Sequence, residues 1–199
     1  MNWTLRGTVY TALFAAIVVV FGYISIPLGF TLVPVTLQTL GVMLAGGLLG
    51  PRYGFISMAL ILVLSAIGFP LLHNGAGGLS ALLGYTGGFI LIWPVSAMLI
   101  GLLLRYAPKK GWQNVLYSFL ILEVFGSLIL YVTGVPWYAR VAHLSIQESL
   151  IAACYPFLIG DVLKAAAATA IIASVRQVFP PERLTGSAKR RVVTEQQSL

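Results

Sequence analysis

Residues 9–28 read VYTALFAAIVVVFGYISIPL, a run of twenty residues without one charged side chain. A helix of about twenty residues is about 30 Å long, which matches the hydrocarbon core of a membrane. The run therefore predicts a membrane-spanning helix. A cleaved signal peptide is the alternative, but the run is longer than a usual signal core and ends in Ile26, Pro27 and Leu28, without small residues for cleavage.

Five further apolar segments follow this run in the sequence. They cover about residues 35–49, 55–72, 89–104, 115–132 and 149–175. The composition agrees, because only 9% of the 199 residues are charged, whereas a soluble domain carries about 25%. We therefore expect an all-α membrane protein with six transmembrane helices in one domain, residues 1–179, and a basic tail, residues 180–199.

Three places should interrupt these helices. Segment 50–53 (Gly-Pro-Arg-Tyr) predicts a tight turn between the second and third runs. Pro94 is expected to kink the fourth run, and Pro156 and Gly160 to interrupt the sixth. The single cysteine, Cys154, excludes an intrachain disulfide.

The basic residues predict the orientation. If the N-terminus is cytoplasmic and the chain crosses six times, only Arg140 lies outside and Lys164 lies within a span. The other Lys and Arg residues are then cytoplasmic: Arg6, Arg52, Arg105, Lys109, Lys110, Arg176, Arg183, Lys189, Arg190 and Arg191. This asymmetry follows the positive-inside rule and puts both termini in the cytoplasm. The charges lie between and beyond apolar runs, so the net charge of +7 does not indicate nucleic-acid binding.

Two ionisable residues fall inside the sixth run. Asp161 and Lys164 are three positions apart and share one helix face. Each costs about 2.5–3.5 kcal/mol at the centre of a membrane. They are either an internal ion pair that permits insertion or a polar anchor for a ligand, and the nearby helix breaks favour the ligand site. Glu123, in the fifth run, is a protonated or paired acid, a ligand contact, or a proton-coupling group.

The segment 74–88 is rich in glycine, which favours irregular backbone close to a ligand, such as a lid; a flexible outer loop is the alternative. Asn74 in this segment offers both a donor and an acceptor. The sequence contains no Gly-Lys dipeptide, so it has no P-loop for ATP hydrolysis. His73 and His143 lie far apart without a third ligand nearby, so we expect no metal site.

Several short motifs, in order and at matching spacing, resemble one family over about residues 7–175. They are LVPVTLQTLG (32–41), LLGPRYG (48–54), GFP (68–70), NGAGG (74–78), GYTGGF (84–89), GVPW (134–137) and PFLIGDVLK (156–164). The sequence is similar to the BioY family, the biotin-specific S component of energy-coupling factor (ECF) transporters.

The resemblance implies a multi-pass protein of a prokaryotic plasma membrane with a biotin pocket near the outer face. It also implies a transmembrane coupling protein and two cytoplasmic ATPase subunits as partners, membrane lipid around the helices, and no cofactor. It assigns the coupling-protein contact to Ala12 and Ala16. The biotin contacts that it implies are Asp161, Lys164, Asn74, Gly75, Gly77, Gly78, Gly87 and Gly88.

The sequence departs from the family pattern at three positions. Tyr85 and Phe89 stand in a motif where family members commonly read Gly-Pro-Thr-Gly-Gly-Tyr, so Phe89 lacks a phenol hydroxyl. Ile90 stands where some members carry arginine, which moves the expected carboxylate contact to Lys164 and backbone amides.

Three other functions compete with biotin capture. The same architecture can serve another vitamin, such as thiamine or riboflavin. A proton-coupled or solitary secondary transporter of biotin or a related vitamin would use Glu123 and Asp161. An intramembrane enzyme needs clustered histidines and acids or a nucleophile–histidine pair, which the spans lack, so we expect no enzymatic activity.

Overall fold

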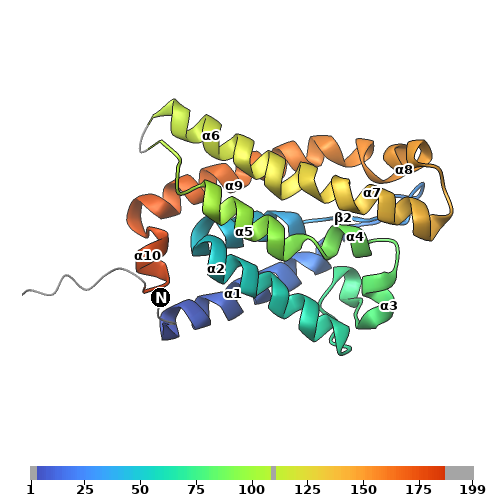
Figure 1. Ribbon diagram of the computed structural model, residues 1–199, viewed down its shortest axis with the longest axis horizontal. Coiled ribbons are helices and arrows are strands. Elements are labelled where there is room, and N and C mark those ends of the chain that lie inside the picture. The colour runs from blue at the N-terminus through green and yellow to red at the C-terminus, as the bar shows by residue number, and fades with distance from the viewer. Residues whose placement is uncertain (1–3, 109–110, 187–199) are drawn as a thin grey trace, which may run out of the picture.

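The computed structural model describes residues 4–108 and 111–186, which form a bundle of helices (Figure 1). The longer helices are α1 (Leu5–Tyr23), α2 (Gln38–Ala66), α5 (Trp93–Leu103), α6 (Trp112–Glu123), α7 (Ile129–Ala142) and α9 (Leu158–Val178). The short helices are α3 (Gly78–Leu83), α4 (Gly87–Ile90), α8 (Ile146–Ala153) and α10 (Pro181–Leu184). The remaining elements are strands β1 (Ser25–Ile26) and β2 (Val35–Thr36), 3-10 turns η1 (His73–Gly75) and η3 (Tyr155–Phe157), and the π-helical η2 (Val124–Leu128).

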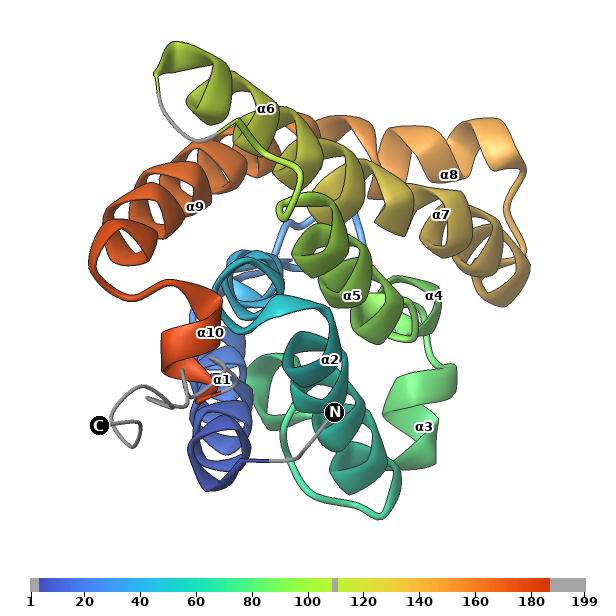
Figure 2. The same cartoon turned by 60° about the vertical axis from the view of Figure 1, so that its left-hand side comes forward.

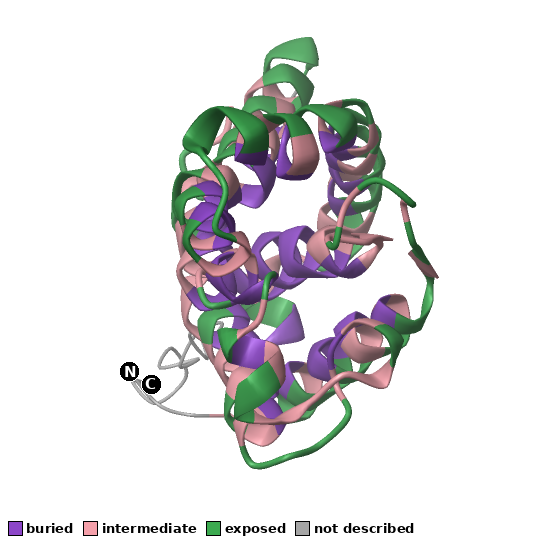
Figure 3. Cartoon of the chain, turned by 90° about the vertical axis from the view of Figure 1, so that its right-hand side faces the viewer, coloured by how far each residue is buried: buried purple, intermediate pink, exposed green. Residues whose placement is uncertain are grey.

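The helices form two groups with α5 between them. Helices α1, α2 and α3 lie on one side, and α6 to α9 lie on the other (Figures 1 and 2). Helix α2 packs against both α1 and α5. Buried residues line the inward faces of the helices, and exposed residues cover the outer faces (Figure 3). Because many of the exposed residues are large and apolar, the outer surface suits lipid.

Helix α2 reverses direction at Gly50. This residue has φ +78° and ψ −179°, a conformation that glycine adopts readily because it has no Cβ atom. A Cβ atom on Gly54 would lie 3.1 Å from the Cα atom of Gly46, although eight residues of continuous helix span about 12 Å. The two halves of α2 are therefore packed side by side, and the turn predicted at 50–53 is confirmed.

The prolines behave differently from one another. Pro156 lies in η3, between α8 and α9, as expected for an interruption of the sixth run. The fourth run is also interrupted, at Leu91 and Ile92 between α4 and α5, and Pro94 lies in the first turn of α5, where its missing N–H costs nothing. Gly160 lies inside α9 without a break, because glycine lowers helix propensity by only about 1 kcal/mol.

The glycine-rich segment is less irregular than expected. It contains the helices α3 and α4, so the prediction of irregular backbone is wrong for those residues. Its irregular part is the turn around Asn74, Gly75 and Gly78, all with positive φ. The antiparallel pair β1–β2, with Ser25 opposite Thr36, has no counterpart in the predicted elements.

The chain is a multi-pass membrane protein by helix length and composition. Four helical segments are long and apolar enough to cross a membrane: Leu5–Tyr23, Gln38–Ala66, Trp112–Ala142 and Ile146–Val178. A shorter apolar segment covers Gly87–Leu103. Of the predicted tail, residues 181–184 form α10 and bury Leu184. Lys109, Lys110, Lys189, Arg190 and Arg191 lie outside the described residues.

Candidate functional site

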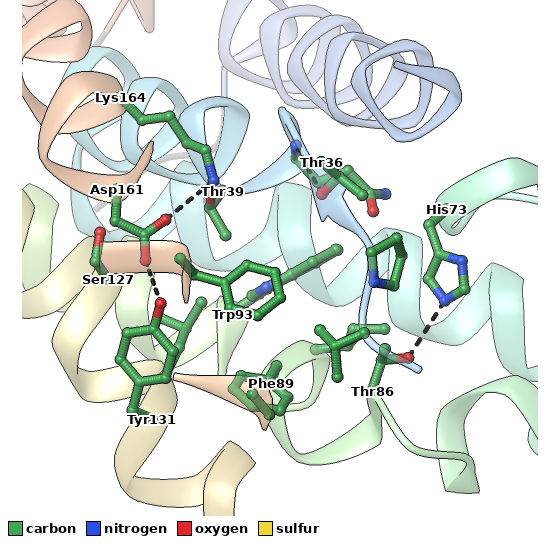
Figure 4. A pocket seen from close by; sticks show the side chains of 17 residues that line it. Thr36, Thr39, His73, Thr86, Phe89, Trp93, Ser127, Tyr131, Asp161 and Lys164 are labelled. Carbon is green, nitrogen blue, oxygen red and sulfur yellow. Dashed lines mark hydrogen bonds and ion pairs between the residues drawn. The ribbon is translucent and has the colours of Figure 1, made fainter. Parts of the chain in front are cut away.

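A cavity lies where the β2 segment and the start of α2 meet α4, α5, α7 and α9. Its lining comes from six parts of the chain: Val33, Pro34, Thr36, Gln38 and Thr39; His73; Thr86, Phe89, Ile90 and Trp93; Ser127, Leu130 and Tyr131; Ala153 with Phe157; and Asp161 with Lys164. Figure 4 shows polar side chains at two ends of this cavity with aromatic rings between them. An apolar cavity with a few polar side chains is the usual form of a small-molecule site.

At one end, Asp161 is the centre of a polar network. Lys164 Nζ donates to Asp161 Oδ1 at 3.0 Å and to Thr39 Oγ1 at 3.1 Å. The Tyr131 hydroxyl donates to Asp161 Oδ2. Asp161 and Lys164 are one turn apart on α9, and both side chains are at most 10% exposed. Because a charge at membrane depth is costly, the ion pair and its two hydroxyl partners stabilise each other here.

Three further polar atoms in the lining residues are buried without a partner among the described residues. They are Gln38 Nε2, Trp93 Nε1 and Ser127 Oγ. A buried donor without a partner costs about 1–3 kcal/mol. These atoms are therefore available to a ligand or to water.

At the other end of the cavity, His73 Nε2 lies 3.4 Å from Thr86 Oγ1 (Figure 4). Burial lowers the pKa of His73 below its ordinary value. The imidazole is therefore neutral at pH 7, and it can both donate and accept a hydrogen bond.

The wall between the two ends is aromatic. The rings of Phe89 and Tyr131 meet edge to face with centroids 6.0 Å apart. Phe89 lacks a hydroxyl, but Tyr131 beside it has one, and that hydroxyl is bound to Asp161. Ile90 is a buried apolar lining residue, whereas Tyr85 lies outside the lining and packs near Tyr138, with ring centroids 6.1 Å apart.

Comparisons with known proteins identify the family. Residues 1–181 match the model of the BioY family. The chain belongs to the BioY family. It is 34% identical over 177 residues to the biotin transporter BioY of Lactococcus lactis subsp. cremoris, covering 88% of this chain and 93% of the relative. It is 38% identical over 179 residues to the biotin transporter BioY of Rhizobium etli, covering 88% and 95%.

A solved structure supports the same family assignment. The crystal structure of the S-component for biotin from an ECF-type ABC transporter superposes with a TM-score of 0.81 at 34% identity. The match covers 87% of this chain and 92% of that chain. The BioY fold therefore extends over nearly all of the described residues.

The structure brings together only part of the set of biotin contacts that the resemblance implies. Asp161 and Lys164 line the cavity, and the other six residues do not appear in its lining. Asn74 is exposed in η1. Gly77 is close to Phe69, since a Cβ there would lie 2.2 Å from the Phe69 carbonyl oxygen. Their contact with a ligand stays a prediction.

Gly87 and Gly88 allow α4 to approach α7. A Cβ on Gly88 would lie 2.4 Å from Cβ of Trp137 and 2.7 Å from the carbonyl oxygen of Thr133. A Cβ on Gly87 would lie 2.0 Å from the Leu82 carbonyl oxygen. Both glycines thereby position Thr86 and Phe89, which do line the cavity.

Sequence reasoning did not single out Thr39, Gln38 or Tyr131. Gln38 and Thr39 lie in the motif 32–41. Two polar residues next to an apolar run are the feature of the sequence that could have indicated a binding site there. Tyr131 is one tyrosine of nine and carries no local signal. Glu123 lies outside the cavity lining, half-buried, and its Oε2 has no partner among the described residues.

Proposed function

We propose that this chain binds biotin in the cavity and acts as the S component of an ECF-type vitamin uptake transporter. The observation that carries the proposal is the Asp161–Lys164 pair, which lines the cavity of a BioY family member. The relatives are named biotin transporters, and the superposed structure is an S-component for biotin.

The chemistry of the cavity suits this ligand. Biotin has a urea with two N–H donors and one acceptor at one end, a carboxylate at the other, and an apolar thioether ring between. A carboxylate such as Asp161 accepts the N–H groups of a urea, and Lys164 meets an acceptor oxygen. The aromatic wall around Phe89 and Trp93 provides an apolar surface for the ring.

We also propose six crossings with both termini in the cytoplasm. The reversal of α2 at Gly50 supports two crossings within that element. The start of α1 and α10 lie at the same end of the bundle, as an even number of crossings requires (Figure 1). The C-terminal ends of α5 and α9 lie at that end too (Figure 1); Arg105 follows α5, and Arg176 is in the last turn of α9.

The partners follow from the S-component assignment. We propose that a transmembrane coupling protein contacts α1 at Ala12 and Ala16, and that two ATPase subunits supply the energy. Both alanines are exposed, and small residues let membrane helices approach closely. A proton-coupled or solitary transporter is the alternative, and it predicts uptake that persists in cells without the ATPases but stops when the proton gradient collapses.

Binding of labelled biotin to the purified, detergent-solubilised chain tests the proposal. We expect binding that unlabelled biotin displaces and that lipoate, thiamine and riboflavin do not. Asp161→Asn and Lys164→Ala should each weaken binding at least about tenfold, or about 1.4 kcal/mol. Glu148→Gln is the matched control, because Glu148 is exposed on α8 and glutamine also suits a capping box.

Folded wild-type protein that does not retain biotin would refute the proposed ligand. Wild-type affinity in both Asp161→Asn and Lys164→Ala would remove the ion pair from the site and leave the ligand assignment to the other lining residues.

A further inference from the structure

A second cavity lies where α5 and α9 end and α10 begins, next to the turn of α2. Its volume is about 570 Å³, and three arginines line it: Arg52, Arg105 and Arg176. Glu182 is the carboxylate among its lining residues. Within the described residues, this arginine cavity therefore has three guanidinium groups against one carboxylate, and the biotin proposal uses none of them.

The guanidinium of Arg176 is held in place by backbone carbonyls. Arg176 Nε donates to the Gly47 carbonyl at 2.8 Å, and Nη1 donates to the Leu104 carbonyl at 3.1 Å. Pro51, four residues after Gly47, has no N–H for the Gly47 carbonyl, so the arginine takes its place. Because these carbonyl oxygens carry no net charge, they do not neutralise Arg176, and its positive charge remains in the cavity wall.

A helix N-terminus adds to this positive charge. After the turn at Gly50, the second half of α2 begins with Pro51, and residues 50–53 line the cavity. The N-terminal end of a helix carries about half a positive charge and favours anions. The helix start, which includes Arg52, and the arginines Arg105 and Arg176 come from three different parts of the chain and line one cavity.

The cavity also lies at a level that suits a membrane interface. Tyr106 follows α5 and is 73% exposed, and Trp112 begins α6 and is 71% exposed. Tyrosine and tryptophan are enriched where a membrane meets water, the depth of the lipid phosphates. Arginine binds phosphate through paired N–H groups, and basic pockets beside membrane helices bind anionic head groups.

We propose that the arginine cavity binds a phosphate group, supplied by the head group of an anionic phospholipid or by soluble phosphate. The positive charge, the helix start and the interfacial position all favour this anion. The proposal does not depend on biotin binding.

The test uses the purified full chain in detergent. One arm measures binding of phosphatidylglycerol and phosphatidylcholine by native mass spectrometry. The other arm measures thermal unfolding in sodium phosphate and in sodium chloride of equal ionic strength. The variants are Arg105→Gln, Arg52→Gln with Arg105→Gln, and the control Arg140→Gln, an exposed arginine in the last turn of α7.

A lipid source predicts that phosphatidylglycerol binds at least about tenfold tighter than phosphatidylcholine. A soluble source predicts stabilisation by phosphate over chloride. In either case, the lipid preference or the stabilisation by phosphate should be at least fivefold smaller in the double variant and unchanged in Arg140→Gln. If the double variant does not fold, the single variant Arg105→Gln provides the test, because Arg105 is exposed and its replacement should not prevent folding. We expect Arg105→Gln to weaken binding about threefold. No preference for either probe, an unchanged Arg105→Gln, or an equal loss in Arg140→Gln would overturn the proposal.

Discussion

At the scale of single residues, the biotin site depends on how Asp161 is held. Its two oxygens face different partners, since Lys164 donates to Oδ1 and the Tyr131 hydroxyl donates to Oδ2. Lys164 also reaches Thr39 on α2. The ion pair is therefore linked to two other helices, and its position depends on all three.

Tyr131→Phe removes one donor to Asp161 and keeps the ring. We expect biotin affinity to fall about tenfold, because a hydrogen bond to a charged group contributes about 1.5–3 kcal/mol. Equilibrium binding of labelled biotin measures this. Tyr138→Phe on the same helix is the control, since Tyr138 is buried outside the cavity lining. Equal affinity in the two variants would mean that the Tyr131 hydroxyl does not support the site.

His73 predicts a dependence of stability on pH. Burial lowers its pKa in the folded protein, so the unfolded chain takes up the proton first as the pH falls. The stabilisation from the neutral imidazole is therefore complete above the unfolded pKa of about 6.5 and is lost as the pH drops through the folded value. We expect the melting temperature to fall between pH 7 and pH 5 by more in the wild type than in His73→Gln. Parallel curves would contradict this role.

At the scale of elements, glycine decides how closely helices approach. Thr133 and Trp137 on α7 face Gly88 on α4, so a side chain on Gly88 has no room. The Trp137 indole also donates to the Gly84 carbonyl at 2.9 Å, and Thr133 Oγ1 donates to the Gly88 carbonyl at 2.8 Å. These contacts place α4, and with it the aromatic wall of the cavity.

Gly88→Ala should therefore destabilise the protein. The added methyl group overlaps the Thr133 backbone, and overpacking typically costs about 1–3 kcal/mol. Gly160→Ala is the matched control, because a Cβ at that helical position has open space and alanine favours the helix by about 1 kcal/mol. Thermal unfolding should show a lower melting temperature for Gly88→Ala and an equal or higher one for Gly160→Ala. Equal shifts would refute the packing role.

At the scale of the whole molecule, Arg176 joins three helices at one end of the bundle. It lies in the last turn of α9 and bonds to the carbonyl of Gly47 in α2 and of Leu104 at the end of α5. At the same end, Thr4 Oγ1 donates to the Thr185 carbonyl, which connects the start of α1 to the region after α10. The two ends of the described chain are thereby fixed against the bundle.

Arg176→Gln leaves the Gly47 and Leu104 carbonyls without this donor. A buried group without its partner costs about 1–3 kcal/mol, so we expect a clearly lower melting temperature in detergent. Arg183→Gln, an exposed arginine of α10, should change it little. A wild-type melting temperature for Arg176→Gln would show that water replaces the guanidinium.

Local patterns in the sequence determined much of this protein. Long apolar runs predicted the helical membrane fold, because a helix in lipid satisfies its own backbone hydrogen bonds within one segment. The turn at Gly50 and the break at Pro156 followed from the backbone limits of glycine and proline. Asp161 and Lys164 were predicted to share a helix face because residues three apart always do.

The surroundings of that pair depend on tertiary packing. Thr39 is 125 positions away from Lys164, and Tyr131 is 30 positions away from Asp161. No periodicity in the sequence relates residues so far apart, since their meeting depends on how whole helices pack. The same holds for the place of Gly88 against α7, while its contact with a ligand stays a prediction. The identity of a membrane helix is a local property, whereas the composition of a site between helices follows from packing over the entire chain.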